Sequence, residues 1–153
     1  MSKEYLSKEK YQQLQQELQD LTTVKRKEVA DRLEYARSLG DLSENAEYHA
    51  ARDEQGEMEA RIEELSNLLK NAEIIHHKKT DSVIVGSVVT LQKEKETDFV
   101  KYQIVGSEET DLSSGKISYN SPLGNAILGK KKDEKFSFDT PKGSVKYTVI
   151  NIQ

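Results

Sequence analysis

The sequence predicts an α+β protein, with a long antiparallel α-helical coiled-coil hairpin followed by an antiparallel β-sheet domain that carries a short helix. Three observations support this prediction. Residues 1–80 contain two valines and no phenylalanine, whereas residues 81–153 contain eight valines and all three phenylalanines. Apolar residues recur at helical spacing in the first part and alternate with polar residues in the second. The chain is 35% hydrophobic and 33% charged, which suits a thin rod with little core per residue.

The 153 residues leave room for one ordinary domain or two small ones. Because the composition changes near residue 80, we expect two. The predicted boundaries give a helical domain over residues 1–76, a linker over 77–82 and a β-rich domain over 83–153.

The first predicted helix runs from about Ser7 to Arg37, and its apolar positions are mostly three or four residues apart. They are Tyr11, Leu14, Leu18, Leu21, Val24, Val29, Leu33 and Ala36. The spacing slips once near Val24, where a strict heptad would need a stutter.

The second predicted helix has a regular apolar stripe, formed by Met58, Ile62, Leu65, Leu69 and Ala72. Gly56 interrupts this helix at a cost of about 1 kcal/mol relative to alanine. Each helix would be roughly 45 Å long at the usual rise per residue. Gly40 lies between them, where a helix ends and a positive φ is needed, so we expect a hairpin. One unbroken helix or a parallel dimer is the alternative.

The tip of this hairpin, residues 38–48, carries Asp41, Glu44 and Glu47 at three-residue intervals. Asp41 and Glu44 match a capping box for the second helix, and spacing alone favours that role. The functional alternative is metal binding, because Mg²⁺ accepts one or two carboxylates and completes its shell with water and phosphate oxygens. Two carboxylates are too few for a self-contained site but suffice to complete a partner's site.

The second half predicts four strands, with a hairpin turn at Thr140–Gly143 between the last two. They cover residues 87–93, 99–105, 135–139 and 144–152. A short helix follows Ser121, with serine as N-cap and Pro122 at the first helical position. Gly129 would end this helix.

Several classes of protein are disfavoured by composition. The chain has no cysteine, so neither disulfides nor thiolate metal sites are available. No apolar run approaches the length of a membrane span, and the first residues lack the apolar core of a signal peptide. Residues 81–153 hold ten basic and ten acidic residues, which argues against independent nucleic-acid binding. We therefore expect a cytoplasmic protein that does not bind membranes. We also expect a monomer, with pairing of an exposed apolar stripe between two chains as the alternative.

Two motifs resemble one known family. GDLSENAEYHAAR at residues 40–52 is similar to the tip signature of the bacterial transcript cleavage factors of the GreA/GreB type. The stretch around KISYNSP, residues 116–122, is similar to the C-terminal signature of that family. The resemblance covers nearly the whole chain, and its GreA-like members are the nearer match.

The resemblance implies an accessory factor rather than an enzyme. Its partner would be bacterial RNA polymerase, entered through the secondary channel by the coiled coil. The factor would stimulate the polymerase to cleave backtracked nascent RNA near its 3′ end. By motif match, the two essential acidic positions are Asp41 and Glu44, which would share Mg²⁺ with the polymerase active centre. The factor would have no cofactor of its own.

The resemblance also assigns supporting roles. The second domain would be FKBP-like and dock on the polymerase, with Ser121 and Pro122 as candidate docking residues. Gly40 would allow the turn, Ser43 would cap the second helix and Ala46 would let the helices approach. The other candidate tip residues are Leu42, Asn45, Glu47 and Tyr48.

Three rival functions remain open from the sequence. The first is a secondary-channel regulator that inhibits the polymerase, although the intact tip favours rescue of arrested complexes. The second is a coiled-coil chaperone or adaptor, which would leave the acidic tip without a purpose. The third is a peptidyl-prolyl isomerase, which needs an aromatic-lined pocket that a half without tryptophan and with few aromatics hardly supplies.

Overall fold

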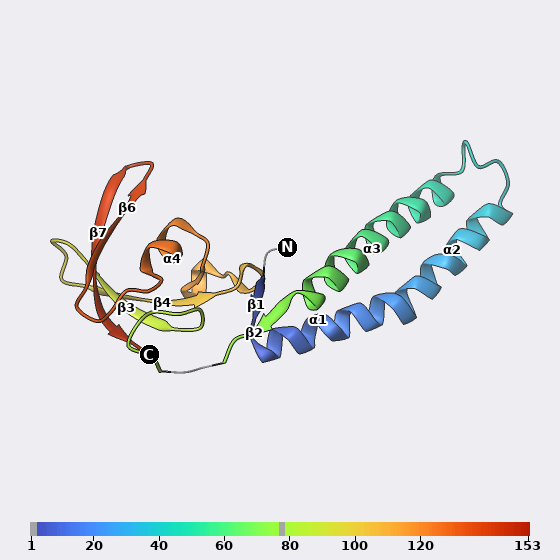
Figure 1. Cartoon of the computed structure of the whole chain (residues 1–153). Coiled ribbons are helices and arrows are strands. Elements are labelled where there is room, and N and C mark those ends of the chain that lie inside the picture. Colours follow the sequence, from blue (N-terminus) through green and yellow to red (C-terminus); the bar gives the residue numbers. More distant parts are fainter. Residues whose placement is uncertain (1–2, 77–78) are drawn as a thin grey trace. The chain divides into compact units, whose positions relative to one another are not determined.

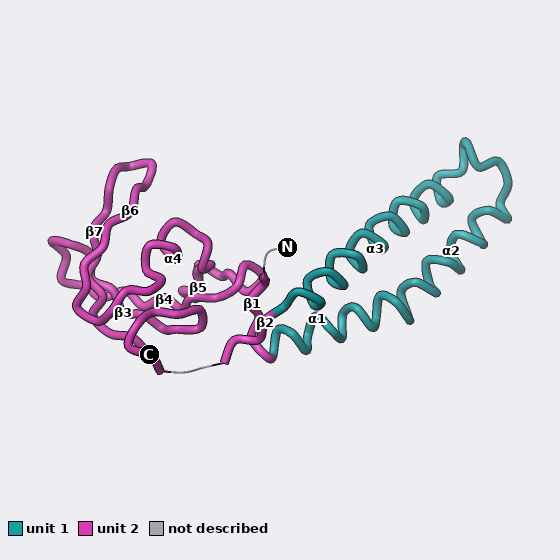
Figure 2. The backbone as a smooth tube through the Cα atoms, viewed as in Figure 1, with its two compact units in different colours: residues 1, 9–72 teal, residues 2–8, 73–153 magenta. Residues whose placement is uncertain are grey.

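The computed structural model describes residues 3–76 and 79–153, which form two compact units (Figure 2). The first unit holds Glu9–Ala72, and the second joins the N-terminal stretch up to Lys8 to Glu73–Gln153. This division differs from the predicted one, because both ends of the expected helical domain belong to the second unit. Residues 77 and 78 of the expected linker lie outside the described residues.

The first unit is the predicted helical hairpin, with one arm formed by three consecutive helical segments (Figure 1). The bounds are α1 (Lys8–Asp20), the π-helix η1 (Leu21–Lys25), α2 (Arg26–Ser38) and α3 (Ala46–Lys70). Val29, Met58 and Ile62 form a buried cluster between the arms, with Leu18, Leu21 and Leu33 packed against it. The two apolar stripes therefore bury each other, as the sequence predicts.

The π-helix explains the slip in the first stripe. A π-helix bonds each N–H to the carbonyl five residues earlier, so it accommodates one extra residue without breaking the helix. Val24 belongs to this segment and is 57% exposed, so its predicted place in the core is wrong. The hydroxyls of Thr22 and Thr23 donate to the Leu18 and Gln19 carbonyls. Such bonds to the preceding turn are a usual contact of threonine side chains within helices.

Ion pairs between the two arms help to set the register in which the apolar stripes pack. Arg26 makes two parallel hydrogen bonds of 2.9 Å to the Glu59 carboxylate, the geometry that a guanidinium favours. Arg61 contacts Glu17 across the hairpin at 2.8 Å. Its guanidinium is the main reason that the pKa of Glu17 lies below its ordinary value.

The second unit contains a five-stranded sheet with the order β5-β4-β3-β7-β6. The four predicted strands are confirmed as β3 (Val88–Lys93), β4 (Phe99–Val105), β6 (Lys135–Thr140) and β7 (Gly143–Ile152). Their inward side chains form one core with Ile127 of the short helix α4 (Pro122–Ile127). The core residues are Val83, Val89, Leu91, Ile104, Ile117, Ile127, Phe136, Val149 and Ile152.

The sheet is antiparallel, as predicted, except at one edge. Strand β5 (Lys116–Ser118) pairs with β4 in parallel, with Ile104 opposite Ile117. Strand β5 is three residues long and was not predicted from the sequence. Neither were β1 (Glu4–Leu6) and β2 (Ala72–Ile74), which form a separate two-stranded sheet. Leu6 in β1 is fully buried, which ties the N-terminal strand into the second unit.

The predicted short helix and its caps are confirmed. The Ser121 hydroxyl accepts a hydrogen bond from the Gly124 N–H at 3.1 Å, and Pro122 opens the helix. Gly129 follows with φ of +79°, the left-handed backbone that commonly stops a helix. The predicted turn at Thr140–Gly143 closes the β6–β7 hairpin.

Candidate functional site

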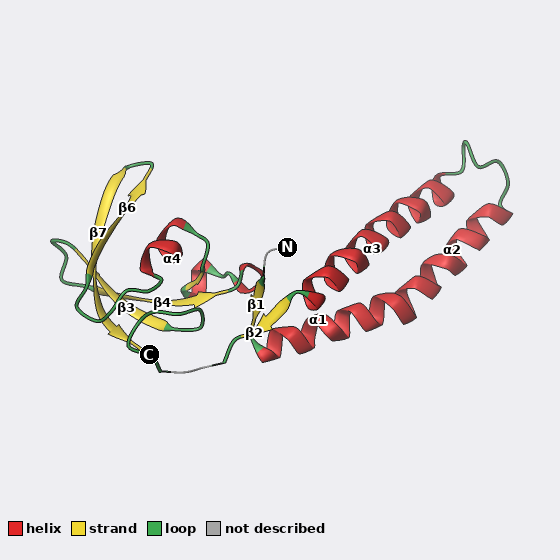
Figure 3. Ribbon diagram, viewed as in Figure 1, coloured by secondary structure: helices red, strands yellow, loops and turns green. Residues whose placement is uncertain are grey.

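The free end of the hairpin is a loop that leaves α2 after Ser38 and enters α3 at Ala46 (Figure 3). The Leu39 N–H bonds to the Ala36 carbonyl and the Gly40 N–H to the Arg37 carbonyl, which finishes the last turn of α2. Gly40 then takes φ of +114°, a backbone conformation that L-residues rarely adopt. The positive φ expected at Gly40 is therefore confirmed.

The predicted capping box is wrong. Asn45, not Asp41 or Ser43, is the N-cap of α3, and its side-chain oxygen accepts the Tyr48 N–H at 3.0 Å. The helix therefore begins five residues after Asp41, and Glu44 precedes the cap. Asparagine, aspartate and serine are all good N-caps, so the sequence pattern did not decide between them.

The two candidate carboxylates consequently lie before α3, in the loop. Both Asp41 and Glu44 are exposed on the loop. One oxygen of Asp41 accepts from the Ser43 N–H at 3.1 Å and from the Ser43 hydroxyl at 2.9 Å. Its second oxygen has no hydrogen-bond partner among the described residues, and neither does Glu44. Four or more lone-pair directions are thus available to an external ligand.

The other candidate tip residues divide into exposed and half-buried side chains. Leu42, Ser43, Ala46 and Glu47 are exposed, and Asn45 and Tyr48 are half-buried. The predicted role of Ala46 in close helix approach is wrong, because Ala36 and Ala51 are the alanines buried on facing helices. The Tyr48 ring contacts His49 edge-to-face at 5.7 Å.

The tip does not form a complete metal site by itself. Among the described residues, no group of three or more histidine, cysteine, aspartate or glutamate side chains could hold a metal ion. The donor set of Asp41 and Glu44 nevertheless fits Mg²⁺, which binds hard oxygens and usually takes few protein ligands. The arrangement suits an ion whose other ligands come from elsewhere.

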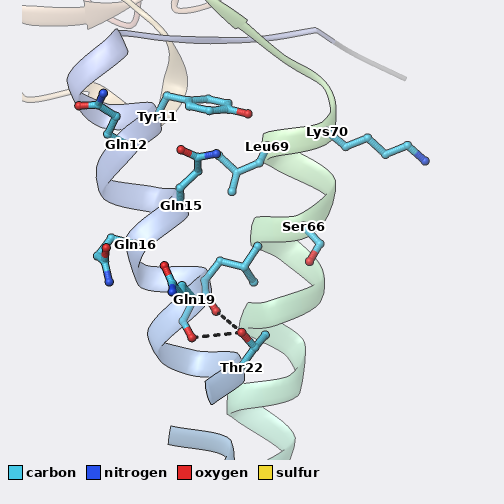
Figure 4. Close-up of a pocket in the computed structure, with 10 residues that line it drawn as sticks. Tyr11, Gln12, Gln15, Gln16, Gln19, Thr22, Ser66, Leu69 and Lys70 are labelled. Carbon is cyan, nitrogen blue, oxygen red and sulfur yellow. Dashed lines mark hydrogen bonds between the residues drawn. The ribbon is translucent and has the colours of Figure 1, made fainter. Parts of the chain in front are cut away.

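One cleft lies in the hairpin but has different chemistry from the tip. It has a volume of about 880 Å³ and lies between α1–η1 and the C-terminal end of α3 (Figure 4). Its polar lining is mainly glutamine amides, and it contains no carboxylate. Tyr11 and Gln15 point toward α3, whereas Gln16 points away from it. The cleft is therefore separate from the acidic tip.

Comparison with protein families identifies both halves of the chain. Residues 4–74 match the family model described as "Transcription elongation factor, N-terminal", and residues 78–153 match "Transcription elongation factor, GreA/GreB, C-term". The chain belongs to the GreA/GreB family of transcription elongation factors. The resemblance seen in the tip and in the C-terminal motif is thereby confirmed over nearly the whole sequence.

Individual relatives agree with the family assignment. The transcription elongation factor GreA of Lachnoclostridium phytofermentans is 46% identical over 99% of this chain and 96% of its own length. GreA of Bacillus cereus is 45% identical over 97% of this chain and 95% of its own length. The crystal structure of GreA factor homolog 1 from Thermus thermophilus covers 99% of both chains at 29% identity, with a TM-score of 0.46. The assignment rests on the sequence matches.

The remaining candidate residues of this GreA/GreB family member lie in the second unit. Ser121 and Pro122 form the start of α4, where the serine hydroxyl is occupied as a cap. Their proposed part in docking stays a prediction. No helix among the described residues is long and apolar enough to cross a membrane.

Proposed function

We propose that this protein binds bacterial RNA polymerase, inserts its hairpin into the secondary channel and stimulates cleavage of backtracked nascent RNA. The factor would rescue arrested elongation complexes in the bacterial cytoplasm and would act as a monomer. It would supply no catalytic centre of its own. The family membership supports a role in elongation, and the tip geometry supports the finer assignment to cleavage.

The observation that carries this proposal is the position of Asp41 and Glu44. Both carboxylates are exposed on the loop at the end of the hairpin, and neither caps a helix. Within the hairpin, Asp41 bonds only to Ser43 of the same loop, through one of its two oxygens, and Glu44 bonds to no described residue. The thin rod offers a means to bring them into a narrow opening, where a globular domain would not fit.

The chain's own residues would hold and orient ligands at the polymerase active centre. In two-metal phosphodiester hydrolysis, Mg²⁺ activates the attacking water and stabilises the leaving oxygen. Asp41 would offer its unpaired carboxylate oxygen as a ligand, while Ser43 fixes the other oxygen through two hydrogen bonds. Glu44 would offer a second ligand or orient the water. Without the cation, both carboxylates would repel the RNA phosphate.

The proposal is tested with Asp41→Asn and Glu44→Gln in backtracked complexes of bacterial RNA polymerase. Both variants should lose stimulation of Mg²⁺-dependent transcript shortening, because a neutral amide lacks the negative charge with which a carboxylate attracts a divalent cation. Helical circular dichroism and polymerase binding should stay at the wild-type level, since neither side chain caps α3. Asp53→Asn is a matched control, because it removes an exposed carboxylate from α3 away from the loop.

Three results would contradict the proposal. Normal cleavage by both variants would show that the carboxylates are not required. An equal loss in Asp53→Asn would point to a general charge effect. Inhibition of transcription by the wild-type protein, without transcript shortening, would support the inhibitory regulator instead.

A further inference from the structure

We propose that Asn45 is a positioning residue that holds the acidic loop in its active geometry by joining the ends of the two helices. The inference rests on the proposed function for its effect on cleavage, but its structural part can be tested alone. Asn45 lies between the two arms of the hairpin and touches both with one side chain.

The two ends of the Asn45 amide bond to different helices. Its oxygen accepts the Tyr48 N–H at 3.0 Å and so caps α3. Its nitrogen donates to the Ala36 carbonyl at 2.5 Å, in the last turn of α2. Ala36 is buried, with 2% exposure, so this carbonyl lies inside the hairpin rather than in solvent. The side chain therefore bridges the points at which the loop leaves α2 and enters α3.

Few other polar contacts join the arms near the tip. Among the described residues, the loop hydrogen bonds other than those of Asn45 run from Leu39 and Gly40 back to α2, from Ser43 to Asp41, and between His49 and the Ser43 carbonyl. None of these crosses from the α2 end to the α3 end. The next cross-arm polar contact is the Arg32–Glu54 ion pair, more than two helical turns into α3. Asn45 is thus the polar crossbridge that closes the loop.

Closure of the loop matters because Asp41 and Glu44 lie within it. A hydrogen bond to a buried carbonyl contributes about 1 kcal/mol, and its loss also leaves that carbonyl without its side-chain partner. Without the crossbridge, the loop ends would rely on packing of Ala36 and Ala51, and the carboxylates would sample more positions. Catalytic groups that are misplaced by about 1 Å can lose on the order of a hundredfold in rate.

The test separates bridging from capping. Asn45→Ser keeps an N-cap of comparable strength but lacks the amide donor that reaches Ala36. Asn71→Ser is the matched control, because Asn71 at the other end of α3 donates within its own helix, to the Asn67 carbonyl. We expect Asn45→Ser to lower the cleavage rate at saturating factor by about tenfold, with an unchanged half-saturating concentration. Asn71→Ser should match the wild type in both quantities.

The distance between the loop and α3 tests directly whether Asn45 holds the loop in one geometry. The chain has no cysteine, so spin labels can be attached at Leu42→Cys on the loop and Glu63→Cys on α3. Asn45→Ser should broaden the distance distribution between these labels, and Asn71→Ser should leave it unchanged. Normal cleavage and an unbroadened distribution would overturn the inference. A weakened binding to polymerase that accounts for the whole rate loss would also overturn it.

Failure of the proposed function gives a different result. If the wild-type protein does not stimulate cleavage, the proposed function fails, and the distance distribution decides the inference by itself. Broadening in Asn45→Ser then supports the crossbridge, and an unchanged distribution refutes it.

Discussion

Two glycines of the hairpin offer a sharp test of how backbone conformation controls its stability. Gly40 and Gly56 are both exposed, and a Cβ atom added to either would meet no other atom within 4 Å. They differ in backbone conformation, because Gly40 has φ of +114° and Gly56 lies inside α3. The same change to alanine should therefore have opposite effects.

The magnitudes follow from these conformations. Gly56→Ala should stabilise the hairpin by about 0.8–1.0 kcal/mol, because alanine loses less backbone entropy in a helix and encounters no clash. Gly40→Ala should destabilise it by about 1–3 kcal/mol, because a side chain at this φ is strained. For a chain of this size, each kcal/mol corresponds to about 2–4 °C in the unfolding midpoint. The two variants should thus differ by several degrees.

Urea denaturation followed by circular dichroism at 222 nm measures the corresponding difference in the free energy of unfolding. The helical signal comes chiefly from the hairpin, because α4 in the second unit has six residues. Gly56→Ala should raise the midpoint with an unchanged slope, and Gly40→Ala should lower it. Shifts in the same direction for both variants would refute the reasoning. Gly40→Ala should also reduce transcript cleavage, since the altered turn would displace Asp41.

Three further predictions concern the helix irregularity, the pH dependence and the sheet. Deletion of Val24 should turn the π-helix into an α-helix and keep the helical dichroism, whereas a deletion within α2 should lower it, because only the first leaves the stripe continuous. The depressed pKa of Glu17 means that its stabilisation is present above its unfolded-state pKa and is lost as pH falls through the lower folded-state value. Arg61→Gln should therefore flatten the fall in unfolding free energy below about pH 5, as measured by urea titration at several pH values. Gly124→Ala should unfold the second unit at lower temperature in calorimetry, since its Cβ would lie 2.0 Å from the Ser118 carbonyl oxygen; an unchanged midpoint would contradict the packing.

The sequence predicted the helical hairpin because apolar periodicity is a local property. The stripes at Leu14–Ala36 and Met58–Leu69 face each other once the chain turns, and one glycine between them suffices to locate the turn. Even the slip near Val24 was visible as a broken spacing. The sequence also put Asp41 and Glu44 at the end of the hairpin.

The tertiary structure decided the features that depend on competition or on distant partners. Aspartate, serine and asparagine all suit an N-cap, and the crossing from α2 to α3 selected Asn45, whose amide also reaches the Ala36 carbonyl. Strands β1, β2 and β5 have three residues each, too few to show a period, and they form because a partner strand lies beside them. Short-range patterning thus determined where the long helices and strands form. Long-range contacts determined that Asn45 caps α3 and that the carboxylates of Asp41 and Glu44 stay exposed.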